Sequence, residues 1–88
     1  MKYTKRKAIL FENVFEKQEN EELKLIETRH IDITGKEFDQ SVLEMEKSGK
    51  KISIKYVSER PQKMRFNEIY ILRTPAGRPD YIYVNVIS

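Results

Sequence analysis

A single helical pattern, in the middle of a chain otherwise rich in alternating apolar residues, is the feature that most constrains the fold. Thr34 and Glu37 have the spacing of a capping box, in which each side chain bonds the other residue's backbone N–H. Apolar or small side chains then recur at helical spacing, at Phe38, Ser41, Val42 and Met45. Gly49 offers the left-handed conformation that commonly ends a helix. The sequence therefore predicts one helix of about three to four turns over residues 35–48.

Five segments with strand character flank this helix. They are rich in β-branched and aromatic residues, several of them in strict alternation, and they span residues 7–15, 22–33, 50–57, 63–73 and 81–87. In the second segment, charged Glu27 and Arg29 interrupt the apolar alternation, which predicts a bulge near Thr28. In the fourth, the unbroken apolar run 69–72 is typical of a strand that is covered on both faces.

Polar or glycine-containing turns separate these segments. The polar run 17–21 joins the first two into an antiparallel hairpin. Residues 74–77, with Pro75 and Gly77 where a tight turn prefers them, join the last two. The order β-β-α-β-β-β is most simply buried by packing the helix on one face of a mostly antiparallel, strongly twisted sheet. The sequence thus predicts one α+β domain over residues 1–88, with a small, partly closed barrel as the alternative.

Composition argues against several classes of chemistry. The chain has no cysteine, and therefore no disulfide, thiolate metal site or cysteine nucleophile. Its one histidine, His30, cannot supply a histidine pair for zinc, and a surface position in a strand is the simpler interpretation. Clustered carboxylates such as Glu44 and Glu46 fall on predicted exposed surfaces, whereas a general acid needs burial to raise its pKa. We therefore expect a non-enzymatic protein without a metal or other cofactor.

The N-terminal segment is not typical of an export signal. Residues 1–7 are basic, but the apolar run 8–11 that follows is far shorter than the hydrophobic core of a signal peptide. No stretch of the sequence approaches the length of a membrane-spanning helix. We therefore expect a cytoplasmic protein that does not associate with a membrane.

Charge is distributed unevenly along the chain. Residues 11–49 hold eleven acidic and five basic side chains, whereas residues 50–88 hold three acidic and eight basic ones. Attraction between the two halves within the fold is the simpler interpretation. Recognition of nucleic acid or of an acidic partner is the alternative.

Strand alternation gathers cations and tyrosines on the face predicted to lie opposite the helix. That face comprises Lys51, Ser53 and Lys55, then Arg65, Asn67, Ile69, Ile71 and Arg73, and finally Tyr81, Tyr83 and Asn85, with Arg60, Lys63 and Arg78 in the flanking turns. Cations and aromatic rings together suit the surface of a partner protein. They also suit single-stranded nucleic acid, whose phosphates attract cations and whose bases stack on rings. A purely structural face is the third interpretation, because tyrosine is common in strands and edge lysines oppose aggregation.

These observations lead to a hypothesis of function. We expect a small non-catalytic binding or regulatory module that recognises a protein or nucleoprotein partner through this basic, tyrosine-containing face and the turn at 74–79. Its size and lack of catalytic groups suit the accessory proteins that phages and mobile elements encode. Direct binding of single-stranded nucleic acid by the same face is the alternative. A homodimer through the C-terminal strand is a further hypothesis, which requires that residues 81–87 lie at an edge of the sheet.

Overall fold

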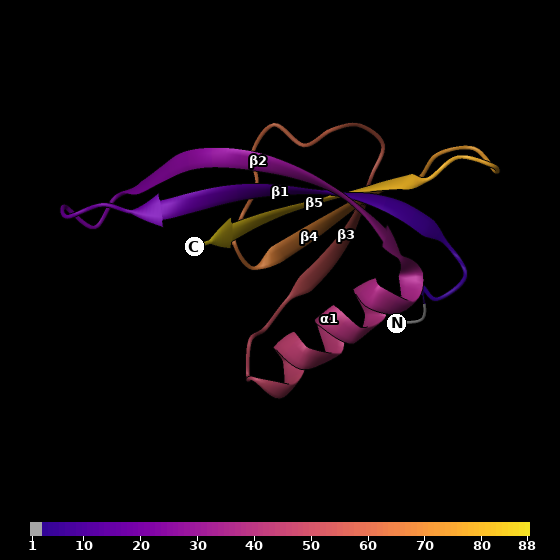
Figure 1. Cartoon of the computed structure of the whole chain (residues 1–88), viewed down its shortest axis with the longest axis horizontal. Helices are drawn as coiled ribbons and strands as arrows, with labels where there is room; N and C mark the ends of the chain where they lie inside the picture. Colours follow the sequence, from indigo (N-terminus) through magenta and orange to yellow (C-terminus); the bar gives the residue numbers. More distant parts are fainter. Residues whose placement is uncertain (1–2) are drawn as a thin grey trace.

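The computed structural model describes residues 3–88 and shows one helix and five strands in a single open sheet. The elements are β1 (Lys7–Lys17), β2 (Leu23–Thr34), α1 (Gly35–Lys47), β3 (Ser53–Val57), β4 (Glu68–Leu72) and β5 (Asp80–Ile87). In Figure 1, α1 lies on one side of the sheet, and the connection between β3 and β4 arches over the other side. The predicted α+β class and element order are confirmed, and the sheet does not close into a barrel.

The strands lie side by side in the order β2-β1-β5-β4-β3, which places the last strand of the chain in the middle of the sheet. β5 pairs with β1 along its whole length on one side and with β4 on the other. The hypothesis of a homodimer through the C-terminal strand is therefore wrong, because it requires an edge strand and β5 lies between β1 and β4.

The sheet is more mixed than the sequence indicated, because two of its four strand pairings are parallel. β1 pairs antiparallel with β2, and β4 antiparallel with β5, whereas β1 with β5 and β3 with β4 are parallel pairs. Parallel neighbours require the chain to return to the same end of the sheet. The long connection 58–67 makes this return after β3. As a result β4 begins at Glu68, and Arg65 and Asn67 lie in the connection rather than in the strand.

The helix begins and ends where its local signals predict. The Thr34 hydroxyl oxygen accepts the N–H of Glu37 at 3.2 Å, and the Glu37 carboxylate accepts the N–H of Thr34 at 2.6 Å. After α1 ends at Lys47, Gly49 takes the left-handed conformation with φ of 87°. The capping box therefore forms as predicted, and it fixes the register in which the apolar stripe meets the sheet.

The hydrophobic core lies between α1 and the sheet. Phe38 of the helix packs with buried side chains that include Ile71 and Ile82, both fully buried and paired across β4 and β5. Ile69 belongs to the same core. The prediction that Ile69 and Ile71 point away from the helix is wrong, because the unbroken apolar run in β4 shows no alternation from which its inner face could be inferred.

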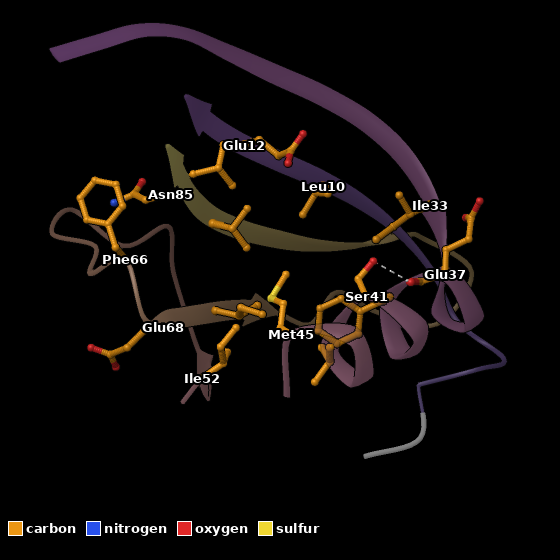
Figure 2. A pocket seen from close by; sticks show the side chains of 15 residues that line it. Leu10, Glu12, Ile33, Glu37, Ser41, Met45, Ile52, Phe66, Glu68 and Asn85 are labelled. Carbon is orange, nitrogen blue, oxygen red and sulfur yellow. Dashed lines mark hydrogen bonds between the residues drawn. The ribbon is translucent and has the colours of Figure 1, made fainter. Parts of the chain in front are cut away.

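The core is incompletely filled along the face of α1 that meets the sheet. A cleft of about 160 Å³ remains there between the helix and the sheet. Figure 2 shows Met45 of α1 and Leu10 of β1 on opposite sides of this cleft, with Ile52 beside Met45. A single water occupies about 30 Å³ in the liquid, so the space is several times larger than one solvent molecule. Ser41 also lines the cleft, but its hydroxyl donates back to the carbonyl of Glu37 at 3.0 Å.

A polar network ties the N-terminal segment to the start of β5 and to α1. The carboxylate of Asp80 is 1% exposed and accepts hydrogen bonds from the Tyr3 hydroxyl, from the Arg6 guanidinium at 2.6 and 3.2 Å, and from the N–H of Thr74 at 3.0 Å. Asp39 of α1 accepts the backbone N–H of Tyr3 at 2.6 Å. The network therefore joins three parts of the chain that are far apart in the sequence.

The same network shifts the pKa values of its members in opposite directions. Burial alone would raise the pKa of Asp80, but the hydrogen bonds from Arg6 and Tyr3 outweigh it and lower that pKa to about 2. Burial, reinforced by the hydrogen bond to Asp80, raises the pKa of the Tyr3 hydroxyl above its usual range. Asp80 thus stays ionised and Tyr3 stays protonated over a wide range of pH.

Gly35 allows the N-terminal segment to pass directly against the first turn of α1. Its N–H donates to the carbonyl of Arg6 at 2.7 Å. A Cβ atom at this position would lie 1.4 Å from the carbonyl oxygen of Tyr3, much closer than any real contact. Only glycine fits this close approach without moving the segment.

Candidate binding face

The face of the sheet opposite α1 carries a row of aromatic side chains. Strand pairing aligns one residue from each strand across the sheet, in the order His30, Phe11, Tyr83, Tyr70 and Lys55. The rings of Phe11 and Tyr83 stack with centroids 5.0 Å apart, and the ring of His30 meets Phe11 edge-on at 4.7 Å. We call these five residues the aromatic row. Such ring contacts stabilise the centre of the face beyond the effect of burial alone.

A second row lies beside the first, one pleat closer to the start of β1. Its members are Asp32, Ile9, Tyr81, Leu72 and Val57, again one from each strand. Asp32 is exposed, and the four apolar or aromatic side chains are each partly exposed. An open sheet face normally carries polar side chains at such positions. This row is therefore unusually apolar for a surface that faces solvent.

The connection 58–67 covers the other end of the face. The hydroxyl of Tyr70 accepts the N–H of Arg65 at 3.1 Å, and the amide of Asn85 donates to the carbonyl of Met64 at 3.1 Å. Tyr70 is consequently only 7% exposed. The connection 58–67 thus covers part of the aromatic row, and the second row forms the more accessible part of the face.

Three of the cations predicted for this face have partners within the fold. Lys55 and Arg65 form ion pairs with Glu68 at 2.5 and 3.5 Å. The hydrogen bond from Lys55 lowers the pKa of Glu68, against the opposing effect of burial. The guanidinium of Arg60 lies 5.9 Å from the ring centroid of Tyr83, which is 6% exposed. These cations hold the connection and the edge strand in place.

The remaining residues predicted for the face are dispersed. Lys63 is exposed in the connection 58–67, and Lys51 lies before β3 at a hollow that the C-terminal end of α1 also lines. Arg73 packs at 4.8 Å over the ring of Tyr56, whose strand partner is buried beneath α1. Arg78 lies in the turn at 74–79, beside the basic N-terminal segment. Of the predicted set, the structure gathers Lys55, Arg60, Arg65, Tyr81 and Tyr83 on the open face.

Three aromatic residues of the face escaped sequence reasoning. Phe11 and Tyr70 each touch or flank Tyr83 in the sheet, and His30 completes the row on β2. The alternation of β1 does place Phe11 on one face with Ile9. No local signal, however, indicates that β1 lies beside β5, because that contact joins the two ends of the chain.

The structure shows no preformed site for metal chemistry within residues 3–88. No three side chains among the histidine, aspartate and glutamate residues of that span gather as metal ligands. His30 is exposed and contacts Phe11 rather than a carboxylate. Across the same residues, α1 is too short and too polar to cross a membrane.

Comparisons with known proteins returned no matching family, no similar curated protein and no similar solved structure. The geometry of the face therefore carries the functional argument.

Proposed function

We propose that this chain is a small non-catalytic module that binds a protein or nucleoprotein partner through the accessible part of the open face. The observation that supports this proposal is a contiguous group of partly exposed apolar side chains, Ile9, Phe11, Leu72 and Tyr81. Ile9 and Leu72 flank Tyr81 in the sheet, and the rings of Phe11 and Tyr81 lie 5.6 Å apart. We call these four residues the docking patch.

The composition of the docking patch matches the centre of a protein interface. Such centres are rich in aromatic and aliphatic side chains and are surrounded by a polar rim. Here exposed Asp32 and His30 lie on the adjoining edge strand, and exposed Arg60 lies in the connection above the face. Apolar groups that remain exposed together on a small protein commonly mark an interaction site.

The electrostatics of the face favour a protein partner over bare nucleic acid. Single-stranded nucleic acid needs free cations for its phosphates and free ring faces for its bases. Lys55 and Arg65 are engaged by Glu68, and Arg60 covers the ring of Tyr83. Nucleic acid would have to compete with Glu68 for Lys55 and Arg65, so direct nucleic-acid binding remains the alternative.

A pair of tyrosine variants tests the docking patch. Tyr81→Ala removes the aromatic centre of the patch, whereas Tyr56→Ala removes an exposed tyrosine on the helix side of the sheet. We expect the partner proteins that crosslink to the wild-type chain in cells of its source to be lost with Tyr81→Ala. The affinity of the chain for such a partner should fall about 30-fold or more, as for an interface hot spot. Tyr56→Ala should retain them. If Tyr81→Ala keeps every partner while its circular dichroism is native, the proposed face is wrong.

An oligonucleotide titration tests the alternative. We expect a fluorescent single-stranded oligonucleotide to show no tight, salt-sensitive binding, because Lys55 and Arg65 of the face are already paired with Glu68. If binding appears, weakens steeply with salt and weakens further with Arg60→Ala, the nucleic-acid alternative replaces the protein partner.

A further inference from the structure

β2 is a long edge strand that exposes its backbone to solvent. It spans twelve residues, Leu23–Thr34, and it is the outermost strand on its side of the sheet. All of its residues except Ile33 are exposed. In Figure 1, β1 and β2 together reach well past the other strands as a two-stranded arm. The opposite edge, β3, has only five residues, Ser53–Val57. An edge of the length of β2 is a ready template for another strand.

The side chains of β2 include four charged groups, but large apolar ones lie exposed between them. The strand contains no proline and a single lysine, Lys24. Large apolar side chains stand in solvent along it, with exposed fractions of 39% for Leu23, 51% for Leu25, 45% for Ile26 and 40% for Ile31. Natural edge strands usually avoid this combination. The strand therefore has the character of a surface that is covered in the working form of the protein.

The sequence of β2 is complementary to itself when it is reversed about Thr28. In antiparallel pairing centred on that residue, Glu27 of each copy lies opposite Arg29 of the other. In a ladder without a bulge, the reversed pairs farther out would be Ile26 with His30, Leu25 with Ile31, Lys24 with Asp32, and Leu23 with Ile33. Opposite charges meet at the central pairs of Glu27 with Arg29, which lie in the regular part of β2. This pattern identifies a second copy of the chain as the fitting occupant.

We propose that two copies of this chain associate through β2, paired antiparallel across a two-fold axis at Thr28, so that their sheets join into one continuous sheet. Within one copy Glu27 and Arg29 already form an ion pair of 2.5 Å on one face of the sheet. Adding the second copy turns this pair into a cluster of four charges with alternating sign. A two-fold axis makes the contact self-complementary and closed.

The charges also exclude the neighbouring registers. Antiparallel partners on one face of a sheet change register in steps that move the axis by one residue. Centring the axis on Glu27 would oppose two carboxylates, and centring it on Arg29 would oppose two guanidinium groups. Like charges directly opposite one another are destabilising. The Thr28 axis is therefore favoured over both of its neighbours.

A bulge in β2 limits how far the outer pairs contribute. Ile26 is an extra residue relative to β1, since Val14 pairs with Glu27 and the next residue of β1 pairs with Leu25. From Glu27 onward β2 is regular. With this bulge the ladder shifts beyond Ile26, so that Leu25 lies opposite His30, Lys24 opposite Ile31 and Leu23 opposite Asp32 of the second copy. The outer pairs are then no longer matched. The central pairs of Glu27 and Arg29 lie inside the regular part, so these two residues set the register.

Charge reversal at the axis provides the test. We expect the wild-type chain to show a concentration-dependent dimer by sedimentation. Glu27→Arg and Arg29→Glu each place like charges opposite one another twice, and each should raise the dimer dissociation constant about tenfold or more. Glu44→Arg, a matched reversal on the exposed side of α1, should leave the constant unchanged.

Mixing the two variants separates this interface from every intramolecular explanation. In an equimolar mixture the introduced arginine of one copy faces the introduced glutamate of the other, and the native Arg29 faces the native Glu27. Association should therefore recover in the mixture, although the ion pair within each single chain stays broken. A wild-type chain that remains monomeric at millimolar concentration would overturn the proposal. A dimer insensitive to both reversals would do so too, and so would a mixture that fails to recover. None of these outcomes involves the docking patch.

Discussion

The two ends of the β1–β2 hairpin are built from the same pair of strands but are held in opposite ways. At the first end, Lys7 pairs with Thr34 beside the buried network of Tyr3, Arg6 and Asp80. We call this end the anchored corner. At the other end, Lys17 pairs with Leu23 beyond the bulge, and past Phe15, whose ring contacts Phe66, the two strands pair only with each other. We call this end, residues 16–26, the arm.

The difference shows that an identical backbone ladder supports very different amounts of stability. At the anchored corner, the buried carboxylate of Asp80 is fully engaged and close to the core, so its loss leaves its donors without their shared acceptor. In the arm, most side chains are exposed, and the loss of one of these removes little buried surface. Substitutions should therefore be costly at one end of the hairpin and nearly neutral at the other.

Removal of the Asp80 carboxylate, at the anchored corner, should lower the free energy of unfolding more than any other change considered for the two ends of the hairpin. Asp80→Ala leaves the Tyr3 hydroxyl, the N–H of Thr74 and the guanidinium of Arg6 without their shared acceptor. Losing one member of a buried ion pair costs about 3–5 kcal/mol, and we expect the lower end because 41% of the Arg6 side chain already reaches solvent. Urea unfolding would measure the loss. Asp32→Ala, the same change at an exposed position of β2, should shift the free energy of unfolding by less than about 0.5 kcal/mol.

Adding one methyl group at Gly35 should have the next largest effect. A Cβ atom there would overlap the carbonyl oxygen of Tyr3 at 1.4 Å, so the N-terminal segment must move away from α1. Overpacking of this kind costs about 1–3 kcal/mol, and we expect the upper part of that range for Gly35→Ala because the segment carries Tyr3 and Arg6 with it. Combining Gly35→Ala with Asp80→Ala should cost clearly less than the sum of the two changes, since both disrupt one network. Full additivity would show that the segment does not connect them.

Titration of Asp80 and Tyr3 at the anchored corner should lower the stability of the fold at acid and at alkaline pH, respectively. The pKa of Asp80 is lowered from 3.8 to about 2, so its contribution is present above about pH 4 and is lost as the pH falls toward 2. That contribution amounts to about 2 kcal/mol. The pKa of Tyr3 is raised, so its contribution is present below its usual value of 10.0 and is lost as the pH rises above it.

Unfolding curves at a series of pH values would measure both losses. Asp80→Asn should flatten the acid side, because the variant has no carboxylate to protonate at that position. Tyr3→Phe should flatten the alkaline side. An acid loss that persists unchanged in Asp80→Asn would assign it to other carboxylates of the chain.

The same contrast explains which parts of the fold could be predicted from the sequence. The capping box at Thr34 and the left-handed glycines Gly49 and Gly77 depend on residues a few positions apart, and all of them form as the local pattern indicates. The inner face of β4 and the central place of β5 depend on contacts between distant segments. The bond between Tyr3 and Asp80 spans 77 residues of the chain. No periodicity in either segment signals such a contact.

The candidate site shows the same division. Tyr81 and Tyr83 could be assigned to one face because the alternation of β5 is strict. Their neighbours could not be predicted. Phe11 belongs to the other end of the chain, and the connection 58–67 was expected to be a short turn followed by a strand. The covering of the aromatic row by the connection 58–67 therefore depends on tertiary contacts. The ion pairs of Lys55 and Arg65 with Glu68 depend on tertiary contacts as well.

The smallest change in the free energy of unfolding should come from a substitution in the arm. It can be compared directly with a substitution at a buried position nearby on β1. Leu25 is 51% exposed beyond the bulge, whereas Val14, just before it on β1, is 1% exposed and pairs with Val86. Leu25→Thr keeps a strand-forming side chain, so the free energy of unfolding of the dilute, monomeric protein should change by less than about 0.5 kcal/mol. Val14→Ala should cost about 1–2 kcal/mol, because it removes buried methyl groups and leaves a cavity. Similar losses from the two changes would mean that the arm is packed in solution even in the monomer, and the contrast between the two ends of the hairpin would then be wrong.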